Sequence, residues 1–130
     1  MSTILIVEDS EDMTNILNRT VSQMGYEVAE AKNGLEAIKV AKRIRPALII
    51  LDLMMPLASG DFALGFVRST EGLKETPVII ISAHPSAQAI ATQLNAQACL
   101  EKPFNLDDLK RLITRYAPPA RDDAPPAQPS

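Results

Sequence analysis

The fold of this chain is decided by residues 48–56, which read Leu-Ile-Ile-Leu-Asp-Leu-Met-Met-Pro. The apolar run at the start is too short for a helix of its own and predicts a buried strand. That run stops at Asp52, and an unpaired carboxylate is costly to bury. In open α/β sheets such a residue emerges at the carboxyl edge, where ligands bind. Pro56 and Gly60 then break the chain before the next helix. From this stretch alone, Asp52 could also simply cap a turn or a helix.

The composition is that of an ordinary globular domain. With 130 residues, 46% hydrophobic and 22% charged, the chain is long enough for one domain with a real core. A net charge of -3 gives no basic face for nucleic acid. The single cysteine, Cys99, excludes an internal disulfide and favours a reducing cytoplasm. Neither a signal peptide nor a membrane span is visible, so we expect a cytoplasmic protein.

The remaining chain alternates between strand and helix patterns. Continuous apolar runs at residues 4–7 and 78–81 resemble the run at 48–51, and shorter strands are expected at 26–30 and 98–100. Apolar residues at helical spacing follow each strand, between residues 13–24, 35–41, 62–67, 87–94 and 106–116. This alternation predicts an α/β fold, a parallel sheet with helices on both faces.

The helix boundaries also have sequence signals. Ser10 and Asn105 are expected to cap the first and last helices. Gly25 and Asn95 are expected to end the first and fourth helices, and Pro46 the second. We expect the folded domain to span residues 1–117. Residues 118–130 hold five prolines and no apolar pattern, which predicts a disordered tail or a linker stub.

Every strand expected near the centre of the sheet ends in a polar residue. These residues are Glu8 and Asp9, then Asp52, Ser82 and Lys102. Because the carboxyl ends of parallel strands share one edge, we expect the five side chains to converge. Three crowded carboxylates call for a hard divalent cation, and Mg²⁺ is the natural candidate. Taken singly, these residues have plain structural explanations. Glu8 and Asp9 could be loop acids, Ser82 a helix cap and Lys102 a surface amine.

The same set suits phosphoryl chemistry. A carboxylate such as Asp52 can attack phosphorus and form an aspartyl phosphate. Lys102 and Mg²⁺ would neutralise charge on the transferring group, and Ser82 would hydrogen-bond one of its oxygens.

The chain resembles the receiver domains of two-component response regulators over residues 3–116. The matching motifs are Glu8-Asp9 after the run at 4–7, Asp52 with Pro56 and Gly60, Ser82-Ala83, Lys102-Pro103-Phe104, and Asn33-Gly34 with Glu36-Ala37. Each motif is short, but their order and spacing together are highly specific.

The resemblance implies a flavodoxin-like, doubly wound sheet of five parallel strands in the order 2-1-3-4-5, with five helices. It implies that Asp52 takes a phosphoryl group from a phosphohistidine of a sensor histidine kinase or phosphotransfer protein, and that the domain then switches binding to a downstream protein target. It implies Mg²⁺ held by Glu8 (often through water), Asp9, Asp52 and the backbone carbonyl of Met54. It also implies a cis peptide bond before Pro103.

Cys99 is a departure from the family pattern. Tyr or Phe usually stands three residues before the lysine, and Cys99 is too small to act as that aromatic switch. A redox sensor is one interpretation of this thiol. We favour a small buried hydrophobe, because no neighbouring His or basic cluster lowers its pKa. His84 is expected at the mouth of the pocket or in solvent.

Other functions remain open at this point. A small phosphohydrolase with an aspartyl nucleophile is chemically close, but it would turn over a small-molecule phosphate. A flavoprotein is disfavoured, since Glu8 and Asp9 would repel the flavin phosphate and aromatic residues are 4% of the chain. A receiver that is never phosphorylated is disfavoured by the complete residue set. We therefore expect a signalling phosphoacceptor rather than an enzyme, either stand-alone or part of a longer protein.

Overall fold

The computed structural model describes residues 2–54 and 60–119. The predictions for Pro56 and for the chain beyond residue 119 lie outside these ranges. No helix in the described ranges has both the length and the apolar character needed to cross a membrane.

One parallel sheet forms the centre of the molecule. Its strands are β1 (Thr3–Val7), β2 (Glu27–Ala31), β3 (Leu48–Asp52), β4 (Val78–Ser82) and β5 (Ala98–Glu101). They lie in the order β2-β1-β3-β4-β5, which confirms the predicted topology. β3 and β4 are buried along their whole length, as their continuous apolar sequences require. The strand predicted at residues 26–30 begins one residue later.

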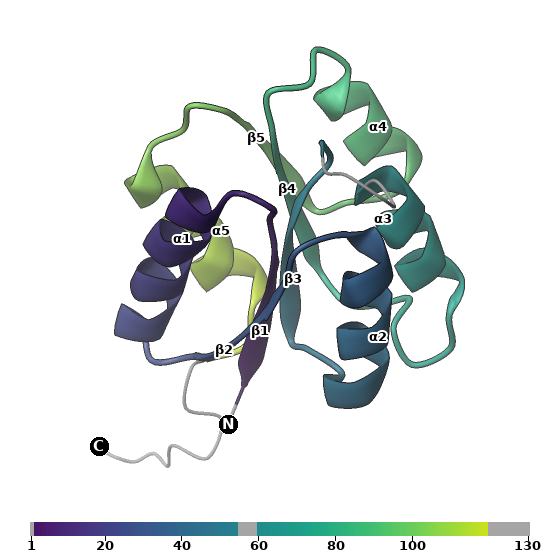
Figure 1. Ribbon diagram of the computed structural model, residues 1–130, viewed down its shortest axis with the longest axis horizontal. Helices are drawn as coiled ribbons and strands as arrows, with labels where there is room; N and C mark the ends of the chain where they lie inside the picture. Colours follow the sequence, from purple (N-terminus) through teal and green to yellow (C-terminus); the bar gives the residue numbers. More distant parts are fainter. Residues whose placement is uncertain (1, 55–59, 120–130) are drawn as a thin grey trace.

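Helices cover both faces of the sheet. They are α1 (Glu11–Gln23), α2 (Gly34–Ile44), α3 (Gly60–Ser69), α4 (Ala87–Gln93) and α5 (Leu106–Tyr116). In Figure 1, α1 and α5 lie on one side of the sheet, and α2, α3 and α4 on the other. Each face has its own apolar core: Ile4, Ile6 and Ile50 belong to the α1–α5 side, whereas Leu5 and Leu51 belong to the opposite side. This division follows from the alternation of side chains along each strand.

The predicted caps are present. The Ser10 side chain accepts from the backbone N–H of Met13, and the Asn105 side chain accepts from that of Asp107. Gly25 and Asn95 have positive φ angles of 98° and 60°, as expected for chain reversals after helices.

The end of α2 agrees with the prediction from Pro46. The helix ends at Ile44, and the residue before the proline, Arg45, adopts a left-handed conformation with φ of 51°. A residue before proline is disfavoured in the right-handed helical region, so the proline acts through its predecessor.

Two side chains at the amino-terminal edge of the sheet make contacts that no sequence pattern predicted. The Arg68 guanidinium donates to the backbone carbonyls of Asn95 and Thr76, at 2.9 and 2.8 Å. The Tyr26 hydroxyl donates to the Pro118 carbonyl at 2.7 Å, so the first residue of the predicted tail contacts the domain. These bonds fasten the edge opposite the polar strand ends.

Candidate functional site

Three carboxylates meet at the carboxyl edge of the sheet. β1 and β3 are neighbours, with Val7 paired to Leu51, so Glu8 and Asp52, which follow these two residues, emerge side by side. Glu8, Asp9 and Asp52 each offer an oxygen, and these oxygens all lie within 4.8 Å of one another. Glu8 and Asp52 are buried, whereas Asp9 is exposed. The sequence predicted this convergence.

Lys102, which directly follows the edge strand β5, completes the cluster. Its Nζ lies 3.0 Å from Glu8 Oε1 and 3.1 Å from Asp52 Oδ2. The lysine reaches them because its backbone N–H donates to the Ser82 carbonyl at 2.9 Å, just beyond β5. The Lys102–Pro103 peptide bond is cis, as the resemblance implied. One ammonium group thus pairs with two buried carboxylates.

The pKa values of the cluster respond to this crowding. Burial raises the pKa of Glu8, and the nearby Asp52 charge adds to the rise against the hydrogen bonds from Ser10 and Lys102. For Lys102, burial alone would lower the pKa, but its bonds to Glu8 and Asp52 outweigh it, so the pKa is raised. Lys102 is therefore fully charged at neutral pH.

Backbone amides orient the carboxylates further. The Ser10 N–H donates to Glu8 Oε2 at 3.1 Å, and the Met54 N–H donates to Asp52 Oδ1 at 3.0 Å. Among the residues that the structure describes, each oxygen of Glu8 and Asp52 therefore has one donor. Mg²⁺ takes oxygen ligands and is usually bound through one or two carboxylates with several waters, so the carboxylates of Glu8, Asp9 and Asp52 fit that ion.

Ser82 lies on the next strand of the same edge. It is buried, and Asp52 pairs with Ile81, the residue before it. Its hydroxyl oxygen accepts from the backbone N–H of His84 at 3.0 Å, which leaves the hydroxyl proton available for an acceptor. The polar strand ends predicted from sequence therefore lie along one edge.

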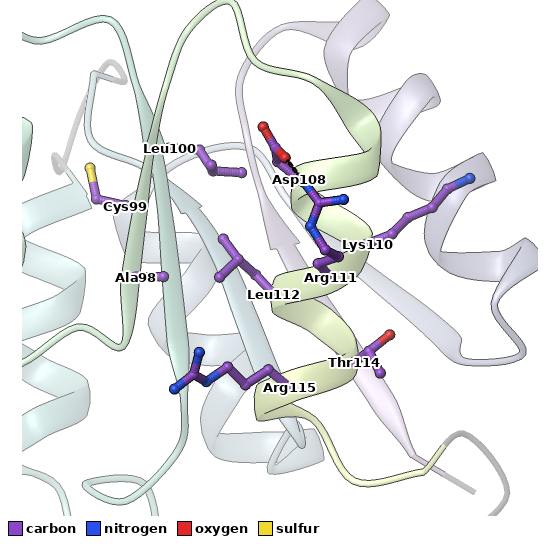
Figure 2. Close-up of a pocket in the computed structure, with 9 residues that line it drawn as sticks. All are labelled: Ala98, Cys99, Leu100, Asp108, Lys110, Arg111, Leu112, Thr114 and Arg115. Carbon is purple, nitrogen blue, oxygen red and sulfur yellow. Dashed lines mark hydrogen bonds and ion pairs between the residues drawn. The ribbon is translucent and has the colours of Figure 1, made fainter.

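Cys99 lies apart from this cluster. It is half-buried in the middle of β5, paired with Ile80. Figure 2 shows its sulfur on the opposite side of β5 from Leu112, which belongs to α5. Burial and the charge of Glu101 raise the pKa of the thiol. Cys99 is therefore a small hydrophobe packed against the core, although it is half-buried and not fully buried as expected.

Two hollows adjoin β5, and neither contains the acidic cluster. A groove of about 730 Å³ lies between β5 and α5 (Figure 2), with Leu100, Leu112 and Arg115 in its lining. A smaller hollow of about 290 Å³ is lined by His84, Pro85, Ala87, Gln88, Cys99 and Glu101. His84 is half-buried there, with its Nδ1 accepting from the Ser86 N–H at 2.9 Å.

The comparisons with known proteins agree with this geometry. The chain is 39% identical over 121 residues to hybrid signal transduction histidine kinase G of Dictyostelium discoideum, covering 88% of this chain and 4% of that protein. It is 30% identical over 117 residues to sporulation initiation phosphotransferase F of Bacillus subtilis, covering 88% and 93%. The chain spans about half or less of the length of several other curated relatives.

Solved structures give the same result. Response regulator protein TrrA of Thermotoga maritima, in complex with Mg²⁺–BeF, superposes with a TM-score of 0.81 at 30% identity, covering 89% of this chain and 99% of that one. The family model for the response regulator receiver domain matches residues 4–114. The chain therefore belongs to the response regulator receiver domain family of two-component signalling.

Proposed function

We propose that this chain is a phosphoacceptor that takes a phosphoryl group onto Asp52 and thereby changes its binding to a partner protein. The donor would be a phosphohistidine on a sensor histidine kinase or a phosphotransfer protein. The observation that carries this proposal is the Lys102 ammonium, which bridges Glu8 and Asp52 inside the three-carboxylate cluster.

The transfer step uses the chain's own groups. A carboxylate oxygen of Asp52 forms the new bond to phosphorus while the phosphorus–nitrogen bond to the donor histidine breaks. The electron pair of that bond stays on the imidazole, which takes up a proton. Lys102, already within 3.1 Å of Asp52, and the Ser82 hydroxyl would contact the phosphoryl oxygens.

Magnesium is part of the proposal. Glu8, Asp9, Asp52 and the Met54 carbonyl would hold the ion, and its charge would offset that of the phosphoryl group when bound. The TrrA complex with Mg²⁺–BeF supports this assignment. In this chain, the Met54 N–H already turns toward Asp52, which keeps that backbone segment beside the carboxylate.

We assign the receiver to residues 1–117 and a linker or tail to 118–130. Its only catalytic acts would be its own phosphotransfer and dephosphorylation. Since Cys99 lacks an aromatic ring, the change would reach the surface through Ala83, His84 and Pro85, because the His84 N–H is bonded to the Ser82 hydroxyl.

Acetyl phosphate with Mg²⁺ tests the proposal, with intact mass as the measurement. We expect one added phosphoryl group in the natural chain and none in Asp52→Asn. Asp12→Asn is the matched control, because Asp12 is an exposed acid in the first turn of α1 and should not alter labelling.

Equal labelling of Asp52→Asn would reject the assignment. Repeated turnover of a small-molecule phosphate by the natural chain would instead favour the phosphohydrolase.

A further inference from the structure

A buried hydroxyl of α1 contacts the backbone of the loop that carries Glu8 and Asp9. Thr14, in the first half of α1, is 2% exposed. Its Oγ1 lies 2.8 Å from the Ser10 carbonyl and 3.3 Å from the Glu8 carbonyl. The first contact lies within the start of the helix, but the second reaches back to the end of β1.

We propose that Thr14 is a positioning residue for the magnesium site, because its hydroxyl fixes the peptide that joins Glu8 to Asp9. This inference rests on the proposed function, which makes both acids metal ligands.

The backbone of Glu8 is held at both of its polar groups. Its N–H donates to the Ala31 carbonyl at the end of β2, at 3.0 Å, and its carbonyl accepts from Thr14. Its carboxylate in turn accepts from the Ser10 N–H. Asp9 lies between these anchored residues and is exposed, so the direction of its carboxylate depends on the peptides on either side.

Removing the hydroxyl would release the Glu8 carbonyl and let this peptide rotate. Mg²⁺ tolerates little departure from octahedral geometry, so a small rotation is costly to binding. Groups that orient metal ligands change affinity by about 10–100-fold when they are lost. We expect Thr14→Val to weaken Mg²⁺ binding about tenfold, the low end of that range, because the contact to Glu8 is long.

The chain offers a matched control in Thr20 of the same helix. Thr20 is also buried, at 5% exposed, and its hydroxyl donates to the carbonyl four residues earlier, that of Ile16, at 2.9 Å. Thr20→Val therefore removes the same group from the same helix without touching the acidic loop. Thr14→Ser keeps the hydroxyl and is the rescue variant.

In the experiment, Mg²⁺ is titrated into the full natural chain and these three variants. The affinity for Mg²⁺ is measured from the NMR shifts of the backbone amides. Weakening of about tenfold in Thr14→Val, with Thr20→Val and Thr14→Ser within about twofold of the natural chain, supports the proposal. Equal affinities in all four proteins, or equal losses in Thr14→Val and Thr20→Val, would overturn it. If Thr14→Val folds poorly, the pair Thr14→Ala and Thr20→Ala gives the same comparison.

A second measurement needs no metal. Hydrogen exchange of the Ser10 amide, which donates to Glu8 Oε2, should be faster in Thr14→Val than in Thr20→Val. Unchanged exchange would show that Thr14 does not fix the loop. If the natural chain binds no Mg²⁺, the metal assignment in the proposed function fails, while this exchange measurement still decides whether Thr14 holds the peptide.

Discussion

Two parts of the carboxyl edge differ in how firmly they are held. Around β1 and β3, every strand residue but Thr3 is buried, and Lys102 joins Glu8 to Asp52. Around α4 and β5, the sheet ends in an edge strand with no fully buried residue. α4 has 7 residues against 13 in α1.

The two ends of α4 also differ in how firmly they are held. In the part of the chain that the structure describes, the N-cap residue Ser86 makes no side-chain capping bond, and the His84 ring binds the Ser86 N–H instead. At the other end, Arg68 holds the Asn95 carbonyl with two nitrogens. Segments with few buried contacts open at low free energy. The carboxyl edge therefore has a rigid part, around β1 and β3 with the acidic cluster, and a weakly held part, around the start of α4 and β5.

The largest expected effect comes from removing the ammonium group of Lys102, which pairs with Glu8 and Asp52 in the rigid part. Lys102→Met leaves the buried carboxylates of Glu8 and Asp52 with no ammonium partner, and breaking a buried pair in this way costs about 3 kcal/mol or more. Urea unfolding at pH 7 in EDTA measures this loss. The loss should shrink as the pH falls, because Glu8, whose pKa is already raised, takes up a proton in the folded state.

Lys110→Met is the control for this substitution. Lys110 is exposed on α5, and its replacement should change the free energy of unfolding by less than about 0.5 kcal/mol. Equal small effects of both variants would show that the Lys102 ion pairs do not hold the site together.

Magnesium should stabilise the rigid part by mass action. An ion that binds only the folded state at 100 times its dissociation constant adds about 2.7 kcal/mol. Thermal melts should therefore shift upward as Mg²⁺ is added, and Asp9→Ala should remove most of that shift. Asp12→Ala, at an exposed acid on α1, should preserve it. A shift that survives in Asp9→Ala would place the ion elsewhere.

The sequence predicted the sheet and its polar edge well, but it did not predict the individual side-chain contacts around them. Continuous apolar runs ending in Asp52 and Ser82 sufficed to predict the sheet and its polar edge, because burial and strand direction are local in sequence. The strand ends also predicted that Lys102 lies near Glu8 and Asp52, which stand 94 and 50 positions away, but not which of their oxygens it contacts. The Arg68 bonds span up to 29 positions, and nothing in the local pattern identifies those partners.

Thr14 shows the same limit at short range. At the sequence level it is one polar residue within an amphipathic helix. Like Thr20 it contacts the carbonyl four residues earlier, and only its second contact, to the Glu8 carbonyl, distinguishes it. Arg45 is a further example, because Pro46 predicts where α2 ends but not that the residue before it adopts the left-handed conformation.

The smallest expected effect concerns Cys99 and tests the weakly held part. If the phosphoryl signal leaves the site through Ser82, it should pass to His84 and then to the start of α4, because the His84 N–H and ring connect these points. Cys99 lies at the middle of β5 and is paired with Ile80 rather than with Ser82. We therefore expect a coupling of about 1 kcal/mol between phosphorylation and partner binding, the low end of the usual range.

Beryllofluoride with Mg²⁺, an acyl-phosphate mimic, makes this measurable by amide NMR shifts. The shifts should concentrate in residues 83–87, and those around Cys99 should be small. Cys99→Tyr should leave acetyl phosphate labelling unchanged, since the side chain lies outside the carboxylate cluster, but it should alter partner affinity by filling the hollow beside His84 and Glu101. Large shifts centred on Cys99 with residues 83–87 unmoved would reverse the comparison, because β5 would then be the part that responds and the start of α4 the part that is fixed.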